Sequence, residues 1–311
     1  MIERVRPKRY ITHNCVENCI ANLCDATSKD FRPLFLYSWD FGFDKYKDTI
    51  GEKIHYHSLF DIGIERYFEI SEFYLNINFS AFSKLQSDII DHIESNHILL
   101  IMSDSFTIPW NTAYNKYHLP HTYLLSFNKK EKCISVTDSF YCQENMKIHN
   151  FAVGSIEQCY SIDIKPEPLS IEKNIELLRE KYLLFLNKNI ENRIYDLIND
   201  LSSDLATINS IDKLTLYPSD ISYATLIRRM IYITGSRYNT ISFFKYIGFS
   251  EKYVEQMSLI HEKWESLKNL FIKILITKKI QLLELASNEL KLLSGLENKL
   301  CNNIIKTEGY K

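Results

Sequence analysis

The chain has 311 residues, of which 45% are hydrophobic and 24% charged, and this composition is typical of globular proteins and too hydrophobic for intrinsic disorder. Its 37 basic and 39 acidic side chains give a formal net charge of -2, so no overall positive charge attracts it to nucleic acid. It contains only 8 glycines and 7 prolines, and the glycines are widely spaced. That spacing excludes the clustered glycines of dinucleotide-binding and phosphate-binding loops.

The length favours two compact domains over one. No run of about 18 apolar residues occurs, so we expect no transmembrane helix. The first residues, MIERVRPKRYITHNC, lack the apolar stretch of a signal peptide. The 7 cysteines are an odd number without paired CxxC spacing. We therefore expect reduced thiols, no metal site and a cytoplasmic protein.

The first half of the chain reads as a helix-containing segment followed by strands. Segment 15–24 has apolar residues at helical spacing, with Thr12 or Asn14 expected as its N-cap, and segment 82–95 has the same spacing. A short apolar run typical of a buried strand covers 97–103. Two further strands are predicted at 121–127 and 133–138, and 157–164 is another candidate strand. The strands at 121–127 and 133–138 are joined by five mostly charged residues, as in a β-hairpin. Helices and strands in this order predict an α+β fold.

The second half reads as helical almost to its end. Two prolines in the segment 165–170 predict a domain boundary, and Ser170 is expected to cap the helix that follows. We therefore expect an α+β domain over 1–167 and an α-helical domain over 168–311. The aromatic-rich segment 30–43 is expected to form core, the alternative being the wall of an apolar pocket.

Three residues suggest nucleophilic chemistry. Cys15 is expected in the first turn of a helix, where free N–H groups and the helix dipole favour a thiolate and provide oxyanion donors. His121 opens one strand of the hairpin and Asp138 ends the other, so the carboxylate is placed to orient the imidazole as a base for the cysteine. Taken singly, each has a plainer alternative: a core cysteine, a surface histidine and a turn aspartate. Pro120 lies between His118 and His121, which excludes metal ligation by the two from one helix face.

The chain resembles the butirosin biosynthesis protein H family of papain-like cysteine acyltransferases and their relatives. The N-terminal matches are His13 and Cys15, the segment 104–127 and the segment 136–140. Within these segments the family's pattern is followed by Asp104, Ile108-Pro109-Trp110, His118, His121 and Asp138. The helical half, including 243–273, also resembles that family's C-terminal domain.

The resemblance implies a papain-like cysteine peptidase fold followed by a helical domain. It implies that Cys15 is the nucleophile, His121 the general base and Asp138 the residue that orients it. A papain-type oxyanion hole uses a glutamine a few residues before the cysteine, and none occurs here, so Asn14 or backbone amides are expected to take that role. Supporting roles are expected for Asn14, His13, Asp104 and His118.

The resemblance also implies a reaction and its partners. The donor would be an acyl group on the phosphopantetheine arm of an acyl or peptidyl carrier protein, and the acceptor a small-molecule amine. No tightly bound cofactor, nucleic acid or membrane is expected, and helices such as 265–305 suggest a homodimer. Two alternatives remain open: a cysteine peptidase or amidase, and a catalytically inactive papain-like binding or assembly protein.

Overall fold

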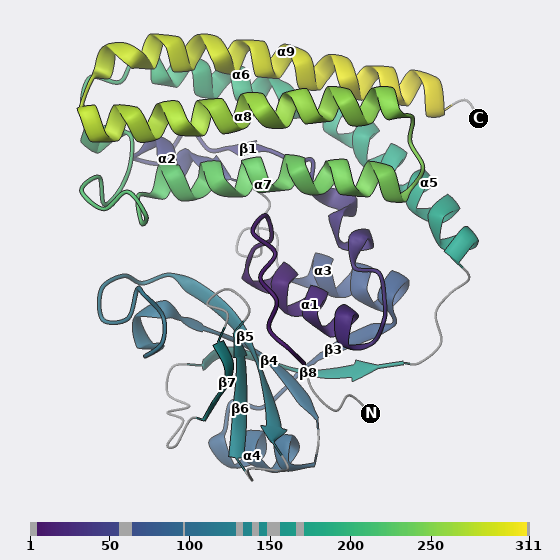
Figure 1. Ribbon diagram of the computed structural model, residues 1–311. Helices are drawn as coiled ribbons and strands as arrows, with labels where there is room; N and C mark the ends of the chain where they lie inside the picture. Colours follow the sequence, from purple (N-terminus) through teal and green to yellow (C-terminus); the bar gives the residue numbers. More distant parts are fainter. Residues whose placement is uncertain are drawn as a thin grey trace. The chain divides into compact units, whose positions relative to one another are not determined.

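A computed structural model describes residues 5–55, 64–95, 97–128, 133–138, 143–147, 156–165 and 171–309 (Figure 1). The chain divides into two compact units. The first combines Met1–Leu34 with Glu65–Leu169, and the second combines Phe35–Ile64 with Ser170–Lys311. The first contains a β-sheet with helices and the second is helical, so the predicted α+β class is confirmed.

Within the described residues, the first unit has an antiparallel sheet of six strands in the order β3-β8-β4-β5-β6-β7 (Figure 1). The strands are β3 (Ile77–Ala81), β4 (Ile98–Asp104), β5 (Pro120–Asn128), β6 (Cys133–Asp138), β7 (Gln143–Lys147) and β8 (Ile156–Ile164). The four predicted strands are confirmed as β4, β5, β6 and β8. The sequence did not reveal β3 and β7, which lie at the two edges of the sheet, because edge strands carry a weaker apolar pattern than central ones.

The helices of the first unit are α1 (Cys15–Ala26), α3 (Glu65–Ile70) and α4 (Gln86–Glu94), and a π-helical turn covers Ser71–Leu75. The predicted helix at 82–95 is shorter than expected, since α4 begins only after Leu85, which is 66% exposed. Ile89 and Ile93 are fully buried, so the predicted apolar face is correct at those two positions.

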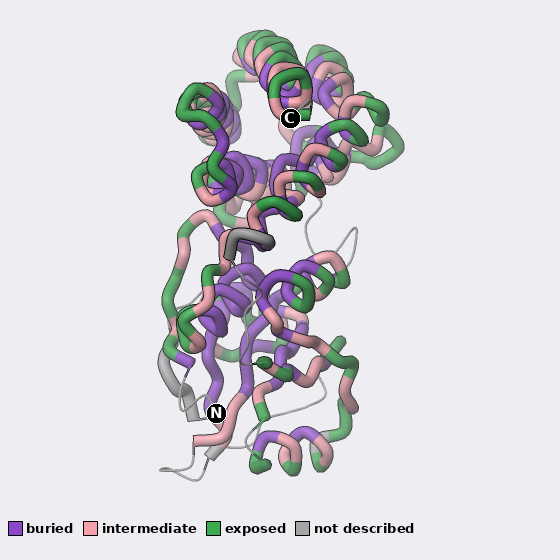
Figure 2. Tube along the Cα trace, turned by 90° about the vertical axis from the view of Figure 1, so that its right-hand side faces the viewer, coloured by how far each residue is buried: buried purple, intermediate pink, exposed green. Residues whose placement is uncertain are grey.

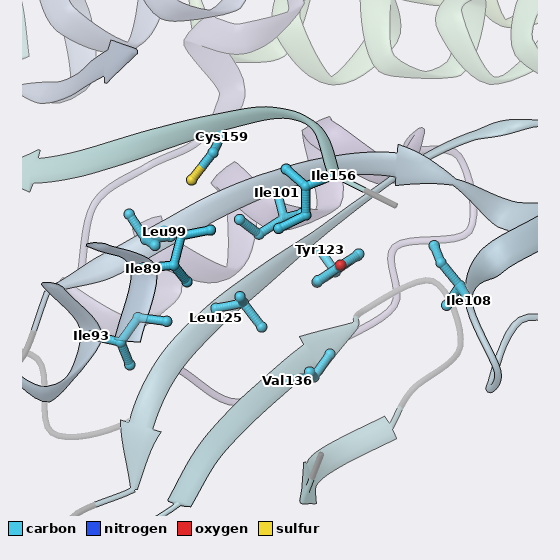
Figure 3. Packing of buried hydrophobic residues seen from close by; sticks show 10 residues of the cluster. All are labelled: Ile89, Ile93, Leu99, Ile101, Ile108, Tyr123, Leu125, Val136, Ile156 and Cys159. Atoms are coloured by element: carbon cyan, nitrogen blue, oxygen red, sulfur yellow. The ribbon is translucent and has the colours of Figure 1, made fainter. Parts of the chain in front are cut away.

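The core of the first unit lies between α4 and one face of the sheet (Figure 3). It consists of Ile89, Ile93, Leu99, Ile101, Ile108, Tyr123, Leu125, Val136, Ile156 and Cys159. Leu100 and Leu124 alternate with these residues along β4 and β5 and are also buried, so both faces of the central strands are covered. Helix α1 packs against β5, where the Cys19 thiol lies 3.7 Å from the Thr122 carbonyl oxygen.

The second unit is built mainly from long helices. They are α5 (Ile171–Glu191), α6 (Ile194–Leu205), α7 (Thr225–Tyr246), α8 (Glu251–Thr277) and α9 (Leu283–Glu308). Figure 2 shows that these helices are buried along one side and exposed along the other, the amphipathic pattern that the periodicity predicts. Of the predicted boundary segment 165–170, only residue 165 is described, and Ser170 lies outside the described residues. Among the described residues, no helix is both long and apolar enough to cross a membrane.

Segment 35–64 belongs to the second unit, whereas the division predicted at 167/168 assigned it to the first. It carries β1 (Gly42–Phe43), α2 (Ile50–Lys53) and β2 (Ile54–His55), with β1 and β2 paired antiparallel. Gly51 in α2 donates its N–H to the Leu214 carbonyl at 2.9 Å. A Cβ at Gly51 would lie 2.4 Å from the Leu226 nitrogen, so only glycine allows α2 this close to α7.

A buried ion pair lies at the centre of the second unit. Both nitrogens Nε and Nη2 of Arg237 donate to the Glu297 carboxylate at 2.9 Å, and both side chains are 0% exposed. The indole N–H groups of Trp39 and Trp264 donate to the same carboxylate at 2.9 and 2.6 Å. Trp39 and Phe41 are fully buried, so the aromatic residues of this part of segment 30–43 form core, as expected.

We expect Glu297→Gln to destabilise the protein by about 3–5 kcal/mol, because the substitution leaves the Arg237 charge buried without its counter-charge. Urea unfolding of the full chain, followed by far-UV circular dichroism, measures this free energy. Glu289→Gln is the matched control in the same helix, since Glu289 pairs at 3.5 Å with a partly exposed Lys263. That control should cost less than about 1 kcal/mol. Equal losses of unfolding free energy in the two variants would contradict the expectation that the buried Arg237–Glu297 pair contributes more to stability than the partly exposed Lys263–Glu289 pair.

Candidate active site

The fold places Cys15 at the first position of α1. Asn14 is the N-cap: its Oδ1 accepts the N–H groups of Val16 at 3.0 Å and Glu17 at 2.9 Å. The Glu17 carboxylate in turn accepts the Asn14 N–H at 2.9 Å, which completes a capping box. Asn14 rather than Thr12 therefore caps the helix. The Cys15 N–H has no intrahelical acceptor at this position, and the thiol lies at the positive end of the helix dipole.

The structure brings His121 and Asp138 together. His121 Nε2 lies 2.6 Å from Asp138 Oδ2, and the two residues are only 4% and 0% exposed. The pairing follows from the hairpin register, in which Leu124 of β5 faces Thr137 of β6. Continuing this register by one residue places Asp138 opposite Tyr123. His121 lies two residues before Tyr123, so its side chain is on the same face of the sheet as that of Asp138.

His121 also connects to Cys15. The Cys15 side chain lies close enough to the imidazole to contribute to the pKa of His121. Burial by itself lowers the pKa of His121. The charge and hydrogen bond of Asp138, together with the interaction with Cys15, outweigh burial and raise this pKa to about 9. The imidazole is therefore protonated near neutral pH, which is the state that stabilises a neighbouring thiolate.

Trp110 is a member of the site whose role the sequence did not reveal. Its indole N–H donates to Asp138 Oδ2 at 2.8 Å, the same oxygen that His121 contacts. Its ring meets the Tyr123 ring edge-on at a centroid distance of 5.5 Å. The available signal was chemical: a tryptophan in a polar loop needs an acceptor for its N–H when it is partly buried. Trp110 therefore helps to hold the Asp138 carboxylate beside His121.

Glu17 and Tyr67 form a buried hydrogen-bonded group with Asn14, the residue that precedes Cys15. The Tyr67 hydroxyl donates to Glu17 Oε1 at 2.8 Å, and Asn14 Nδ2 donates to the Tyr67 oxygen at 3.2 Å. Burial raises the pKa of Glu17 to about 7, although the hydrogen bonds from Asn14 and Tyr67 oppose this shift. Glu17 is not among the site residues predicted from the sequence. The capping-box spacing of Asn14 and Glu17 was the signal that would have revealed it.

The structure gives two of the predicted support residues specific contacts. The Asn14 side chain caps α1 and donates to Tyr67. The role of Asn14 in an oxyanion hole stays a prediction. His13 is buried, stacks on Tyr10 at a centroid distance of 4.8 Å and meets Phe31 edge-on. Burial lowers the pKa of His13 to about 3, so the ring is neutral near neutral pH. It contributes packing and no charge beside Cys15.

Asp104 and His118, the other two predicted support residues, form their own pair. His118 Nδ1 lies 2.5 Å from Asp104 Oδ2. Asp104 ends β4 opposite Pro120, and the next pair in this register is Ser103 with His121. The pair therefore lies at the same end of β4 and β5 as the candidate base.

Four other described cysteines are more deeply buried than Cys15, which is 9% exposed. Cys19, Cys24, Cys159 and Cys301 are 0–3% exposed. Burial raises the pKa of each of these thiols, which disfavours the reactive thiolate. Within the described residues, no group of three or more histidine, cysteine, aspartate or glutamate side chains is arranged to hold a metal ion.

Comparison with known proteins adds no family assignment. The sequence matches no protein-family model and no curated protein. The resemblance to the butirosin biosynthesis protein H family therefore depends on the motif residues alone.

We expect alkylation of Cys15 by iodoacetate to slow as the pH rises through about 9, where the His121 imidazolium loses its proton. The reason is that the imidazolium attracts this anionic reagent to the thiolate. In Asp138→Asn the fall should move to lower pH by about one unit or more, because the charge that raises the pKa of His121 is removed. Peptide mass spectrometry after timed labelling measures the rate at each cysteine.

The matched control is Asp163→Asn, which removes an exposed carboxylate from β8. Its profile should coincide with that of the unaltered protein. An Asp138→Asn profile that also coincides would contradict the assigned coupling of Asp138 to His121.

Proposed function

We propose that the protein is a cysteine-dependent acyltransferase whose first unit has a papain-like fold. Cys15 is the nucleophile, His121 the general acid and base, and Asp138 the residue that orients His121. The observation that carries the proposal is the single imidazole that contacts both the thiol at a helix N-terminus and a fully buried carboxylate. This is the arrangement that activates a cysteine for covalent catalysis.

The first half-reaction transfers the acyl group to the protein. The Cys15 thiolate attacks the carbonyl carbon of a thioester donor, and the C–S bond to the donor breaks. The departing thiolate takes the proton from His121, which becomes neutral. Thiol and thioester exchange one C–S bond for another, so the acyl-enzyme forms without a large change in energy. A thioester on the phosphopantetheine arm of a carrier protein is the donor that we propose.

The second half-reaction passes the acyl group to an amine. The amine attacks the Cys15 thioester, the C–S bond breaks, and His121 accepts a proton as the amide forms. Cys15 and His121 are then again thiolate and imidazolium. The N–H of Cys15, at the open end of α1, is a donor for the oxyanion in both steps. Cys15 and His121 are 9% and 4% exposed, and limited access of water favours transfer over hydrolysis.

We expect an N-acetylcysteamine thioester to add its acyl group to Cys15, and Cys15→Ala to abolish this adduct. Intact-protein and peptide mass spectrometry locate the added mass. Cys24→Ala is the matched control, since Cys24 lies in the same helix, is fully buried and has a pKa raised by burial. It should retain the adduct.

Absence of any adduct on Cys15 with thioester donors would refute the proposal. An adduct that turns over only by hydrolysis, together with cleavage of amide substrates, would favour a cysteine peptidase or amidase. A Cys15 that reacts no faster than an ordinary exposed thiol would favour a binding protein without activity.

A further inference from the structure

A second histidine–carboxylate pair lies at the end of β4. Asp104 accepts the backbone N–H groups of Phe106 at 3.0 Å and Leu119 at 3.1 Å and contacts His118 Nδ1 at 2.5 Å. Burial raises the pKa of Asp104, but the His118 contact and the two backbone hydrogen bonds outweigh it and lower this pKa overall. The carboxylate is therefore ionised near neutral pH and can only accept, so the proton of a neutral His118 lies on Nδ1.

The other ring nitrogen of His118 faces solvent. The side chain is 73% exposed, and Nε2 makes no hydrogen bond to any residue that the structure describes. The ring stacks on Phe106 with a centroid distance of 4.3 Å and an interplanar angle of 12°. The stack and the Asp104 contact together fix the orientation of the ring. An unconstrained surface histidine samples several rotamers and both tautomers, whereas here the Nε2 lone pair is held ready to accept a proton.

The chemistry of the second half-reaction needs such a group. An α-amine has a pKa of about 8, so it arrives largely as an ammonium ion, which has no lone pair for attack. It must lose one proton before attack and another as the amide forms. His121 is neutral in the acyl-enzyme and accepts only one of these two protons. A second base near the site removes this limitation.

We propose that His118, positioned by Asp104, is a second base that deprotonates the ammonium group of the acceptor. This inference depends on the proposed acyltransferase function. The His118 Nε2 lone pair takes a proton from R–NH3+, which gives R–NH2 and a His118 imidazolium. The amine lone pair then attacks the Cys15 thioester, Cys15 leaves as thiolate and His121 takes the second proton. His118 returns its proton to solvent through its exposed nitrogen.

The test measures acylation and transfer separately in the full-length protein. The donor is the N-acetylcysteamine thioester, and the two acceptors are glycinamide and hydroxylamine, which is mostly unprotonated near neutral pH. His118→Asn keeps a donor toward Asp104 and removes the Nε2 base. We expect it to leave acylation of Cys15 within about twofold and to slow transfer to glycinamide by about tenfold at pH 7, since about a tenth of an amine with a pKa of about 8 is already unprotonated there. Transfer to hydroxylamine should change by less than about twofold.

Two further measurements separate a base from a structural residue. Added imidazole should restore transfer to glycinamide in His118→Asn, because the position is exposed. The 15N chemical shifts of neutral His118 should show the Nδ1–H tautomer, and Asp104→Asn should lose this preference. His97→Asn, at an exposed histidine just before β4, is the matched control and should leave both transfer rates unchanged.

The outcomes are distinguishable. Unchanged transfer to glycinamide in His118→Asn, or equal loss with both acceptors, would overturn the role of His118. An Nε2–H tautomer would overturn it as well. A protein that is never acylated on Cys15 would instead refute the acyltransferase function on which the inference depends.

Discussion

The buried carboxylate of Asp138 is the constraint around which the candidate site is organised. An ionised group without exposed surface costs several kcal/mol unless charges and hydrogen bonds inside the protein compensate it. His121 and Trp110 supply this compensation, both at the same oxygen. The charge of Asp138 and its hydrogen bond raise the pKa of His121, so the imidazole beside Cys15 is protonated near neutral pH.

The second unit also contains a buried carboxylate that is compensated by a cation and by indole N–H groups, but here the cation is an arginine. Glu297 is as deeply buried as Asp138, and its partners are Arg237 and the indoles of Trp39 and Trp264. All three tryptophans of the chain therefore donate to one of two buried carboxylates. The difference lies in the cation, because arginine does not release its proton and histidine does. The arginine pair can serve only as a fixed structural element, whereas the histidine pair can also transfer protons.

Local pattern was enough to predict much of the first unit. The central strand β4 carries a continuous apolar run, and the start of α1 carries a polar cap before apolar residues at helical spacing. Features that depend on contacts distant in sequence could not be read in this way. Two contacts tie segment 35–64 to the second unit: Gly51 packs closely against α7, and the Trp39 indole N–H donates to the Glu297 carboxylate. Neither contact leaves a periodic signal, because each involves a single residue.

The sequence by itself determined the secondary-structure class and the hairpin register that makes a histidine and an aspartate neighbours. It also determined that a cysteine begins the first helix. Only the tertiary structure decided that His121 contacts Cys15, that Trp110 contacts Asp138, and that His118 pairs with Asp104 while presenting its second nitrogen to solvent. The physical reason is that register and capping are set by neighbours along the chain. The pKa of a histidine and the identity of its partners depend on burial and on charges brought together from separate elements.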